Sequence, residues 1–317
     1  MSNFVKLDQE VLNILRCPLC KGELEYRSNL FTCKDCVTEY PMITIGADGY
    51  EEHISDFRIH HPQYCMPEIS AEWAKRQDKF VSLHDKIASS DKYETYVEEI
   101  DSVKEIYYLE FSMQGKVLDV GGHQGRLRHF LNKRDVSLYV CVDPFLEVFS
   151  GIEKQKNLLK AYPSLLEPCN FLACHAEKLP FDKNSFDWVH MRSVLDHFQD
   201  PYISLREAYR VLKPGGFLMI GINVSHGKLP HKTKPKFHLF SFLSKINNKF
   251  RRDGFKGILE GTLNRIWFAK ENDDHMFHWN YENLIDLVHK TNYQLIKHHW
   301  QKPPFDFCIY LSLAKKM

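Results

Sequence analysis

The sequence lacks a large net charge, a long apolar run and a secretory signal, which are features of nucleic-acid-binding, membrane and exported proteins respectively. Lys and Arg total 42 against 41 Asp and Glu, so the formal net charge is only +1, and no overall field draws the protein toward nucleic acid or membrane. No apolar run approaches the roughly 20 residues that a membrane-spanning helix needs. The start of the chain also lacks the basic-then-apolar pattern of a secretory signal. We therefore expect a cytoplasmic globular protein, and 317 residues are enough for about two domains.

Cysteine, by contrast, is plentiful, and four of the nine cysteines form two close pairs near the N-terminus. Each pair encloses two residues, which is the spacing of a zinc knuckle, and a hairpin turning near Ser28-Asn29 would connect the two pairs. Four thiolates complete a tetrahedral zinc ion and leave no position open for a substrate, so a structural site is expected. Its ligands would be Cys17, Cys20, Cys33 and Cys36.

From about residue 111 onward, short apolar runs alternate with amphipathic stretches. A helix is expected from Asp200-Pro201 to about Gly216, because both its start and its stop signals are present. The alternation predicts an α/β fold with a doubly wound, mostly parallel sheet. Strands are expected at 116–120, 138–142, 170–174, 186–190 and 216–222, with a helix at 281–288 and a closing antiparallel pair at 293–300 and 307–313.

A glycine-rich turn follows the first of these strands. Gly121, Gly122 and Gly125 would let the backbone approach a ligand closely, and Asp143 ends the second strand, where its carboxylate could accept both hydroxyls of a ribose. The glycines are too closely spaced for the G-x-G-x-x-G fingerprint of NAD-binding proteins. A nucleoside-containing ligand other than NAD is therefore favoured.

The same stretch resembles the class I S-adenosylmethionine-dependent methyltransferases, in the branch that includes quinone and sterol methylases. The family motif D-x-G-x-G-x-G is matched at residues 119–125, with His123 in place of the middle glycine. Residues 176–187 read Ala-Glu-Lys-Leu-Pro-Phe-Asp-Lys-Asn-Ser-Phe-Asp, which is close to the family's A-E-x-L-P-F-x-x-x-S-F-D. Residues 192–197 and 207–216 match two further motifs, so the resemblance covers about 115–222 and resumes near the C-terminus.

The resemblance implies S-adenosylmethionine as cofactor and assigns residues to it. Two departures bear on the cofactor site: His123 adds a side chain where the family has glycine, and His175 replaces the aspartate that meets the adenine amino group. A neutral imidazole can still form a hydrogen bond at that position. The cofactor-binding residues would be Asp119, Gly121, Gly122, Gly125, Asp143, His175, Ala176 and Glu177.

Methyl transfer requires an acceptor aligned with an already activated methyl group, and a hydroxyl acceptor also benefits from a base. His197 follows the fourth strand beside Asp196 and is the candidate base, with a capping or packing role as the alternative. His226 and His278 are weaker candidates.

The four-cysteine stretch resembles the small zinc-ribbon activator proteins of tRNA and protein methyltransferases, and the ribbons fused to many bacterial methyltransferases. We accordingly divide the chain into a zinc ribbon at 1–50, a helical linker or cap at 51–110, and a methyltransferase domain at 111–317. That last domain would carry an insertion at about 225–274.

The insertion is basic and amphipathic between residues 228 and 256. It could form a lid over the pocket, dock on an anionic membrane surface or bind a phosphorylated substrate or RNA. The family resemblance, together with an insertion larger than a bare cofactor pocket needs, favours methyl transfer to a small molecule such as a sugar, a lipid-linked intermediate or a natural product. The alternatives are methylation of RNA held by the ribbon and the insertion, and a zinc-ribbon scaffold without catalysis.

Overall fold

The computed structural model describes residues 4–46, 51–58, 71–79, 90–224, 275–302 and 308–316. The basic insertion and His226 lie outside the described residues. Within the described ranges, no helix is both long enough and apolar enough to span a bilayer.

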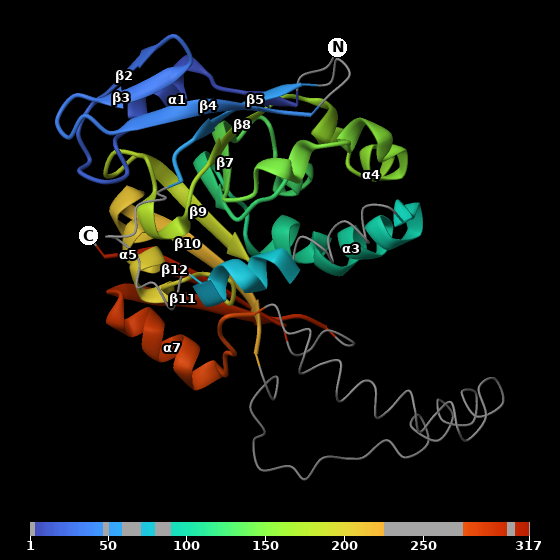
Figure 1. Ribbon diagram of the computed structural model, residues 1–317. Coiled ribbons are helices and arrows are strands. Elements are labelled where there is room, and N and C mark those ends of the chain that lie inside the picture. The colour runs from blue at the N-terminus through green and yellow to red at the C-terminus, as the bar shows by residue number, and fades with distance from the viewer. Residues whose placement is uncertain are drawn as a thin grey trace, which may run out of the picture.

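Seven strands form the sheet that was predicted for the C-terminal domain, in the order β11-β12-β10-β9-β6-β7-β8 (Figure 1). Neighbouring strands are parallel except at β12, which is antiparallel to both β10 and β11. This arrangement confirms the doubly wound α/β fold. The strands are β6 (Gly115–Val120), β7 (Val136–Asp143), β8 (Cys169–Ala173), β9 (Phe186–Arg192), β10 (Leu212–Asn223), β11 (Tyr293–Trp300) and β12 (Cys308–Lys315).

The strands in the middle of this sheet are apolar because both of their faces are covered. All five residues of β8 are buried, as are the last four of β6. Continuous apolar runs of this kind are typical of parallel strands covered on both sides. The α-helices described after β5 are one at residues 71–79, α3 (Tyr93–Glu105), α4 (Lys156–Ala161), α5 (Pro201–Val211) and α7 (Tyr281–Lys290), with a π-helical turn at Ile106–Glu110.

Helix α5 shows how the local sequence sets an element. Asp200 caps its N-terminus by accepting a hydrogen bond from the Ile203 N–H at 3.0 Å, and Pro201 occupies its first position. The helix ends at Val211, earlier than predicted, and β10 begins at once. The Pro-Gly-Gly sequence that was expected to end the helix therefore lies inside β10, where the register with β9 shifts.

The N-terminal module is a small antiparallel sheet with one short helix. Its predicted hairpin is confirmed, since Ser28 and Asn29 both have positive φ, at 51° and 63°, in the turn between β2 and β3. The elements are β1 (Val5–Lys6), α1 (Gln9–Ile14), β2 (Leu24–Arg27), β3 (Leu30–Cys33), β4 (Glu39–Ile45) and β5 (Glu52–Asp56).

This module continues the large sheet. Strand β5 pairs antiparallel with β4 and parallel with β8, and β1 also pairs with β8, so the N-terminal strands cover the outer edge of the sheet (Figure 1). The expected helical segment at 51–110 therefore begins with a strand, because residues 52–55 pair with β4 while Ser55 and Asp56 pair with β8. Within the described part of this segment, the first helix spans residues 71–79.

One ion pair holds the module against α5. The Lys21 Nζ lies 2.8 Å from Glu207 Oε2, which also accepts hydrogen bonds from the Leu179 N–H and from Arg210. The burial of Lys21 lowers the pKa of its ammonium group, and the charge of Glu207 opposes that shift. We expect Glu207→Ala to lower the free energy of unfolding by about 2–3 kcal/mol, because it leaves Lys21 and Arg210 without their carboxylate.

Chemical denaturation monitored by circular dichroism would measure that loss. Arg206→Ala is the matched control, since Arg206 is an exposed residue of the same helix and should change stability by no more than about 0.5 kcal/mol. Equal effects of the two substitutions would contradict the assigned role of Glu207.

Candidate functional site

The four predicted zinc ligands converge at one point in the N-terminal module. Their sulfur atoms all lie within 4.8 Å of one another, with 3.6 Å between Cys17 and Cys36 and 3.4 Å between Cys20 and Cys33. A tetrahedral ion with Zn–S bonds of about 2.3 Å requires S–S separations of about 3.8 Å, so this cluster fits zinc.

Both pairs adopt the same knuckle turn. The Lys21 N–H donates to the Cys17 carbonyl at 2.9 Å, and the Val37 N–H donates to the Cys33 carbonyl at 3.0 Å. Lys21 and Val37 both have positive φ, at 67° and 60°. For Val37, a β-branched residue, this conformation is costly, so the repeated turn indicates a geometry that the metal site requires.

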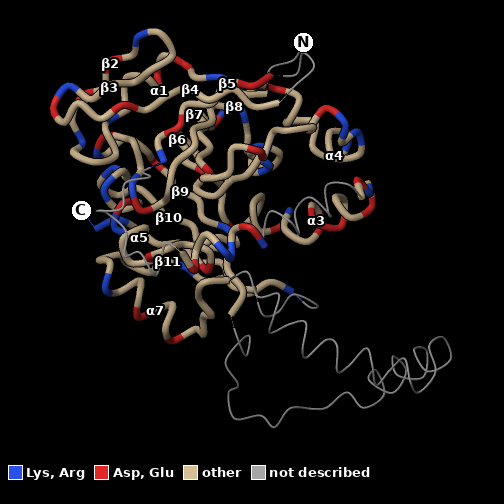
Figure 2. Tube along the Cα trace, in the orientation of Figure 1, with Lys and Arg blue, Asp and Glu red and all other residues tan. Residues whose placement is uncertain are grey.

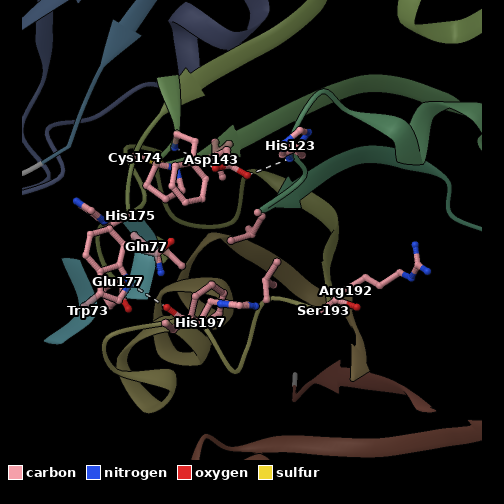
Figure 3. Close-up of a pocket in the computed structure, with 18 residues that line it drawn as sticks. Trp73, Gln77, His123, Asp143, Cys174, His175, Glu177, Arg192, Ser193 and His197 are labelled. Carbon is pink, nitrogen blue, oxygen red and sulfur yellow. Dashed lines mark hydrogen bonds between the residues drawn. The ribbon is translucent and has the colours of Figure 1, made fainter. Parts of the chain in front are cut away.

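A pocket opens at the carboxyl ends of β6, β7, β8 and β9, where ligands bind in sheets of this kind (Figure 3). It contains about 720 Å³ of empty space including its open mouth, which is within the range of small-molecule sites. Six predicted site residues line it: Gly121, Asp143, His175, Ala176, Glu177 and His197.

The glycine turn forms one wall of this pocket. Gly121 has a φ of 68°, and a Cβ added there would lie 2.4 Å from Val194 Cγ1. Gly125 also has positive φ, at 78°. His123, which stands where the family motif has glycine, adopts a φ of 52°, and its ring lines the pocket. The turn therefore keeps the left-handed geometry of the motif despite the added side chain.

Asp143 lies at the end of β7 and is almost completely buried. Its Oδ1 accepts the Phe145 N–H and its Oδ2 accepts the His123 N–H, each at 3.0 Å. Burial raises the pKa of this carboxyl to about 7, and the two backbone hydrogen bonds only partly oppose the shift. Each oxygen can accept a further hydrogen bond, so the carboxylate can bind ribose hydroxyls while it holds the glycine turn in place.

The residues after β8 form the opposite wall. His175 and Ala176 line the pocket, and the His175 ring packs edge-on against Trp73 with 5.2 Å between ring centroids. The Glu177 carboxylate accepts the backbone N–H groups of Gln199 and Asp200 at 2.8 and 3.1 Å. Glu177 therefore connects this wall to the start of α5.

Asp119, Gly122 and Gly125 are not among the described residues that line the pocket. Asp119 is buried beneath the turn, where one carboxylate oxygen lies 2.7 Å from His190 Nδ1 and the other accepts the Tyr139 hydroxyl. A Cβ at Gly122 would lie 2.4 Å from the Asp119 carboxylate. These residues thus support the turn from below.

His197 lies at the mouth of the pocket. Its backbone carbonyl accepts the Trp73 indole N–H at 2.8 Å, and its ring packs against that of His275 with 4.8 Å between centroids. Its Nε2 is 3.9 Å from Asp196 Oδ1. His278 lies beyond, with its ring centroid 6.1 Å from that of His275.

The helix at 71–79 supplies two pocket residues that the sequence analysis missed. No sequence motif marks Trp73 or Gln77 as a pocket residue. Both line the pocket in Figure 3, and the buried Gln77 Nε2 has no hydrogen-bond partner among the described residues. A buried amide donor that faces a pocket without a protein partner fits a bound polar ligand.

Comparison with known proteins agrees with both halves of this architecture. Residues 118–220 match the family described as a methyltransferase domain, and residues 8–66 match the Trm112p-like proteins. The chain thus combines a methyltransferase domain, as the sheet and the pocket indicate, with an N-terminal Trm112p-like zinc-ribbon domain. Both resemblances drawn from the sequence are confirmed.

Individual relatives match over part of their length. An uncharacterized methyltransferase of Schizosaccharomyces pombe is 33% identical over 111 residues, which cover 32% of this chain and 38% of that protein. A demethylmenaquinone methyltransferase of Staphylococcus aureus is 30% identical over 135 residues, covering 41% of this chain and 55% of that protein. The chain thus spans between about two fifths and just over half of the length of these curated relatives.

Among solved structures, a chain from the complex of the Haloferax volcanii Trm112 methyltransferase activator with a protein described as a methyltransferase is 13% identical. The alignment covers 74% of this chain and 97% of that chain, with a TM-score of 0.46.

Proposed function

We propose that this protein transfers the methyl group of S-adenosylmethionine to a small-molecule acceptor at the β6–β9 pocket. The observation that carries this proposal is that the left-handed glycine turn and the buried Asp143 carboxylate line one pocket. Gly121 turns in a left-handed conformation after β6, and the buried Asp143 carboxylate holds that turn through the His123 N–H. Both line the same pocket, and both lie within residues 118–220, which match the methyltransferase-domain family.

In this proposal the walls of the pocket divide the cofactor between them. Gly121 would meet the methionine end, with Gly122, Gly125 and Asp119 shaping the turn from below. Asp143 would accept the ribose hydroxyls, and His175 and Ala176 would lie along the adenine, with Glu177 fixing their position. When bound, the cofactor supplies an electrophilic methyl group, so the protein's task is to align the acceptor with it and exclude water.

The acceptor would enter from the side of β9. A second hollow shares Arg192 and Ser193 with the cofactor pocket, and it is lined by side chains from α3 and from β12. Helix α3 carries several acidic residues and a single lysine (Figure 2). Arg192 and Lys302 also line this hollow and pair with Glu99 and Glu105. The carboxylates outnumber these two cations, so the entrance disfavours a phosphate backbone, which supports a small acceptor over RNA. The acidic residues are Glu98, Glu99, Asp101 and Glu105.

His197 remains our candidate for contact with the acceptor, because it lines the cofactor pocket near the shared wall. Deprotonation of a hydroxyl acceptor would require one of its ring nitrogens within hydrogen-bond distance of that hydroxyl.

Calorimetric titration with S-adenosylhomocysteine tests the cofactor site. We expect micromolar binding by the intact protein and a roughly 10–100-fold loss in Asp143→Asn, because hydrogen bonds to a charged carboxylate contribute about 1.5–3 kcal/mol. The matched control is Asp135→Asn, since Asp135 is exposed and lies before β7, at its opposite end. Absence of binding by the intact protein would refute the proposed function and favour a scaffold.

The affinity should also depend on pH. Ribose hydroxyls bind the ionised carboxylate best, and Asp143 in the free protein has a pKa of about 7. Binding is therefore expected to be full above pH 7 and to weaken by up to about tenfold for each pH unit below it. The same titration, repeated between pH 5.5 and pH 8.5, covers about one pH unit or more on each side of that pKa. The affinity of Asp143→Asn should depend much less on pH than that of the parent protein.

A further inference from the structure

Asp196, His197 and His275 bring three metal-ligating side chains together beside the cofactor pocket, which His197 lines. One ligand atom from each lies within 4.8 Å of the other two. Each imidazole approaches one oxygen of the Asp196 carboxylate, with His275 Nε2 3.3 Å from Oδ2 and His197 Nε2 3.9 Å from Oδ1. This is a second cluster, separate from the four cysteines and built from nitrogen and oxygen atoms.

The two distances fit a shared cation better than a chain of hydrogen bonds. Strong N–H···O bonds to a carboxylate measure about 2.7–2.9 Å, and both separations are longer than that. Two ligands on one tetrahedral ion, each at about 2.1 Å, are instead about 3.4 Å apart. Two histidines and one carboxylate are also the donor set of many three-ligand sites for zinc and iron, in which one or more positions stay open.

The surrounding backbone holds these side chains in place. The Met276 and Phe277 N–H groups donate to the Asp196 carbonyl at 2.7 and 3.1 Å, which fixes the segment carrying His275 against the loop after β9. The Arg76 guanidinium donates to the His275 carbonyl, and its charge is balanced by Glu72 at 2.7 Å. Asp196 and His197 are largely buried, whereas His275 is partly exposed.

We propose that Asp196, His197 and His275 bind one divalent transition-metal ion, such as Zn²⁺, at the edge of the cofactor pocket. Because His197 lines that pocket, the open ligand position lies close to the entering acceptor. The ion would there stabilise an acceptor oxygen in its anionic form. That role rests on the proposed methyl transfer, whereas the binding of the ion does not.

Zinc stoichiometry of the full-length protein tests the binding directly. After dialysis against micromolar zinc, elemental analysis should find two ions per wild-type chain: one on the four cysteines and one on the new site. His275→Ala should retain one, with zinc affinity at the second site at least about 100-fold lower, since even outer partners of metal ligands contribute 10–100-fold. His289→Ala, at an exposed histidine of α7, should keep two.

Cobalt substitution identifies the site that changes. The thiolate-to-cobalt charge-transfer bands of the cysteine site should persist in His275→Ala, while the weaker visible bands of a nitrogen- and oxygen-ligated cobalt disappear. One zinc per wild-type chain, or two in both His275→Ala and Asp196→Asn, would overturn the proposal. S-adenosylhomocysteine affinity is measured in parallel, so failure of the metal site and failure of the cofactor site are distinguishable.

Discussion

Gly121→Ala is expected to weaken the binding of S-adenosylhomocysteine roughly 10–100-fold, because the new methyl group overpacks a wall of the pocket. The added Cβ would lie 2.4 Å from Val194 Cγ1, far inside the 3.5–4.0 Å of a normal carbon contact. Gly121 and Val194 both line the pocket, so relief of the clash must move the pocket itself. Calorimetric titration of the variant measures the loss.

The chain offers a close control for backbone strain. Gly151 has a φ of 70°, nearly the same as the 68° of Gly121, but a Cβ added there would meet nothing within 4 Å. Gly151→Ala should therefore lose about 1–2 kcal/mol of stability to backbone strain, the same strain that Gly121→Ala introduces. It should keep the affinity of the parent protein for S-adenosylhomocysteine. Equal losses of affinity in the two variants would show that strain, and not the contact with Val194, is responsible.

A second variant separates the clash from the turn. Val194→Ala removes both methyl groups near the new Cβ, at 2.4 and 3.5 Å, and leaves only the Val194 Cβ at 3.0 Å. Adding it to Gly121→Ala should therefore recover about tenfold in affinity. Val194→Ala alone should have a small effect. If the double variant binds no better than Gly121→Ala, the close approach of Gly121 to Val194 does not shape the site.

The sequence was sufficient for the features whose signals are local. The knuckle spacing of the four cysteines, the hairpin at Ser28-Asn29 and the strand-end position of Asp143 all depend on residues within one turn or one strand. The structure places each of them as the local pattern indicated. The parallel sheet also followed from periodicity, because buried strands and amphipathic helices differ in their repeat.

Contacts between distant segments could not be read in the same way. Strand β5 was placed in a helical linker, because its pairing with β8 joins residues more than 100 positions apart. Gln77 carries no motif, and its place in the pocket depends on how the helix at 71–79 packs. His275 lies near Asp196 only because tertiary packing brings distant segments together. The sequence showed only that Asp196 adjoins His197. Pairings of this type depend on tertiary packing, which a single sequence leaves open.

Removal of zinc from the four-cysteine site is expected to unfold the N-terminal module. Binding of structural zinc contributes apparent free energies of about 10–16 kcal/mol in small metal-folded units, and two of the ligands, Cys17 and Cys33, belong to the buried core that the module shares with the large sheet. We expect Cys33→Ser or a strong chelator to abolish the cooperative melting of the module and expose its amides to hydrogen exchange. Cys308→Ala, at a buried cysteine of β12 toward the end of the sheet opposite the module, should keep both the zinc and the module.

Zinc loss should also weaken cofactor binding, because the module contacts the pocket beyond β5. The Phe57 N–H donates to the Ala173 carbonyl at 2.7 Å, and the Arg58 guanidinium donates to the Pro144 carbonyl at 3.2 Å. Pro144 lines the cofactor pocket beside Asp143. Loss of these two hydrogen bonds, at about 1 kcal/mol each, should lower the affinity for S-adenosylhomocysteine by roughly tenfold or more.

Arg58→Ala in the zinc-loaded protein isolates this route. Its module should stay folded and protected from exchange, while the affinity falls by several fold because the Pro144 carbonyl loses its donor. An affinity that stays within twofold of the parent protein after complete zinc release would show that the cofactor pocket does not depend on the module. If zinc release lowers the affinity for S-adenosylhomocysteine but Arg58→Ala does not, the module would act on the cofactor pocket through the pairing of β5 with β8 instead.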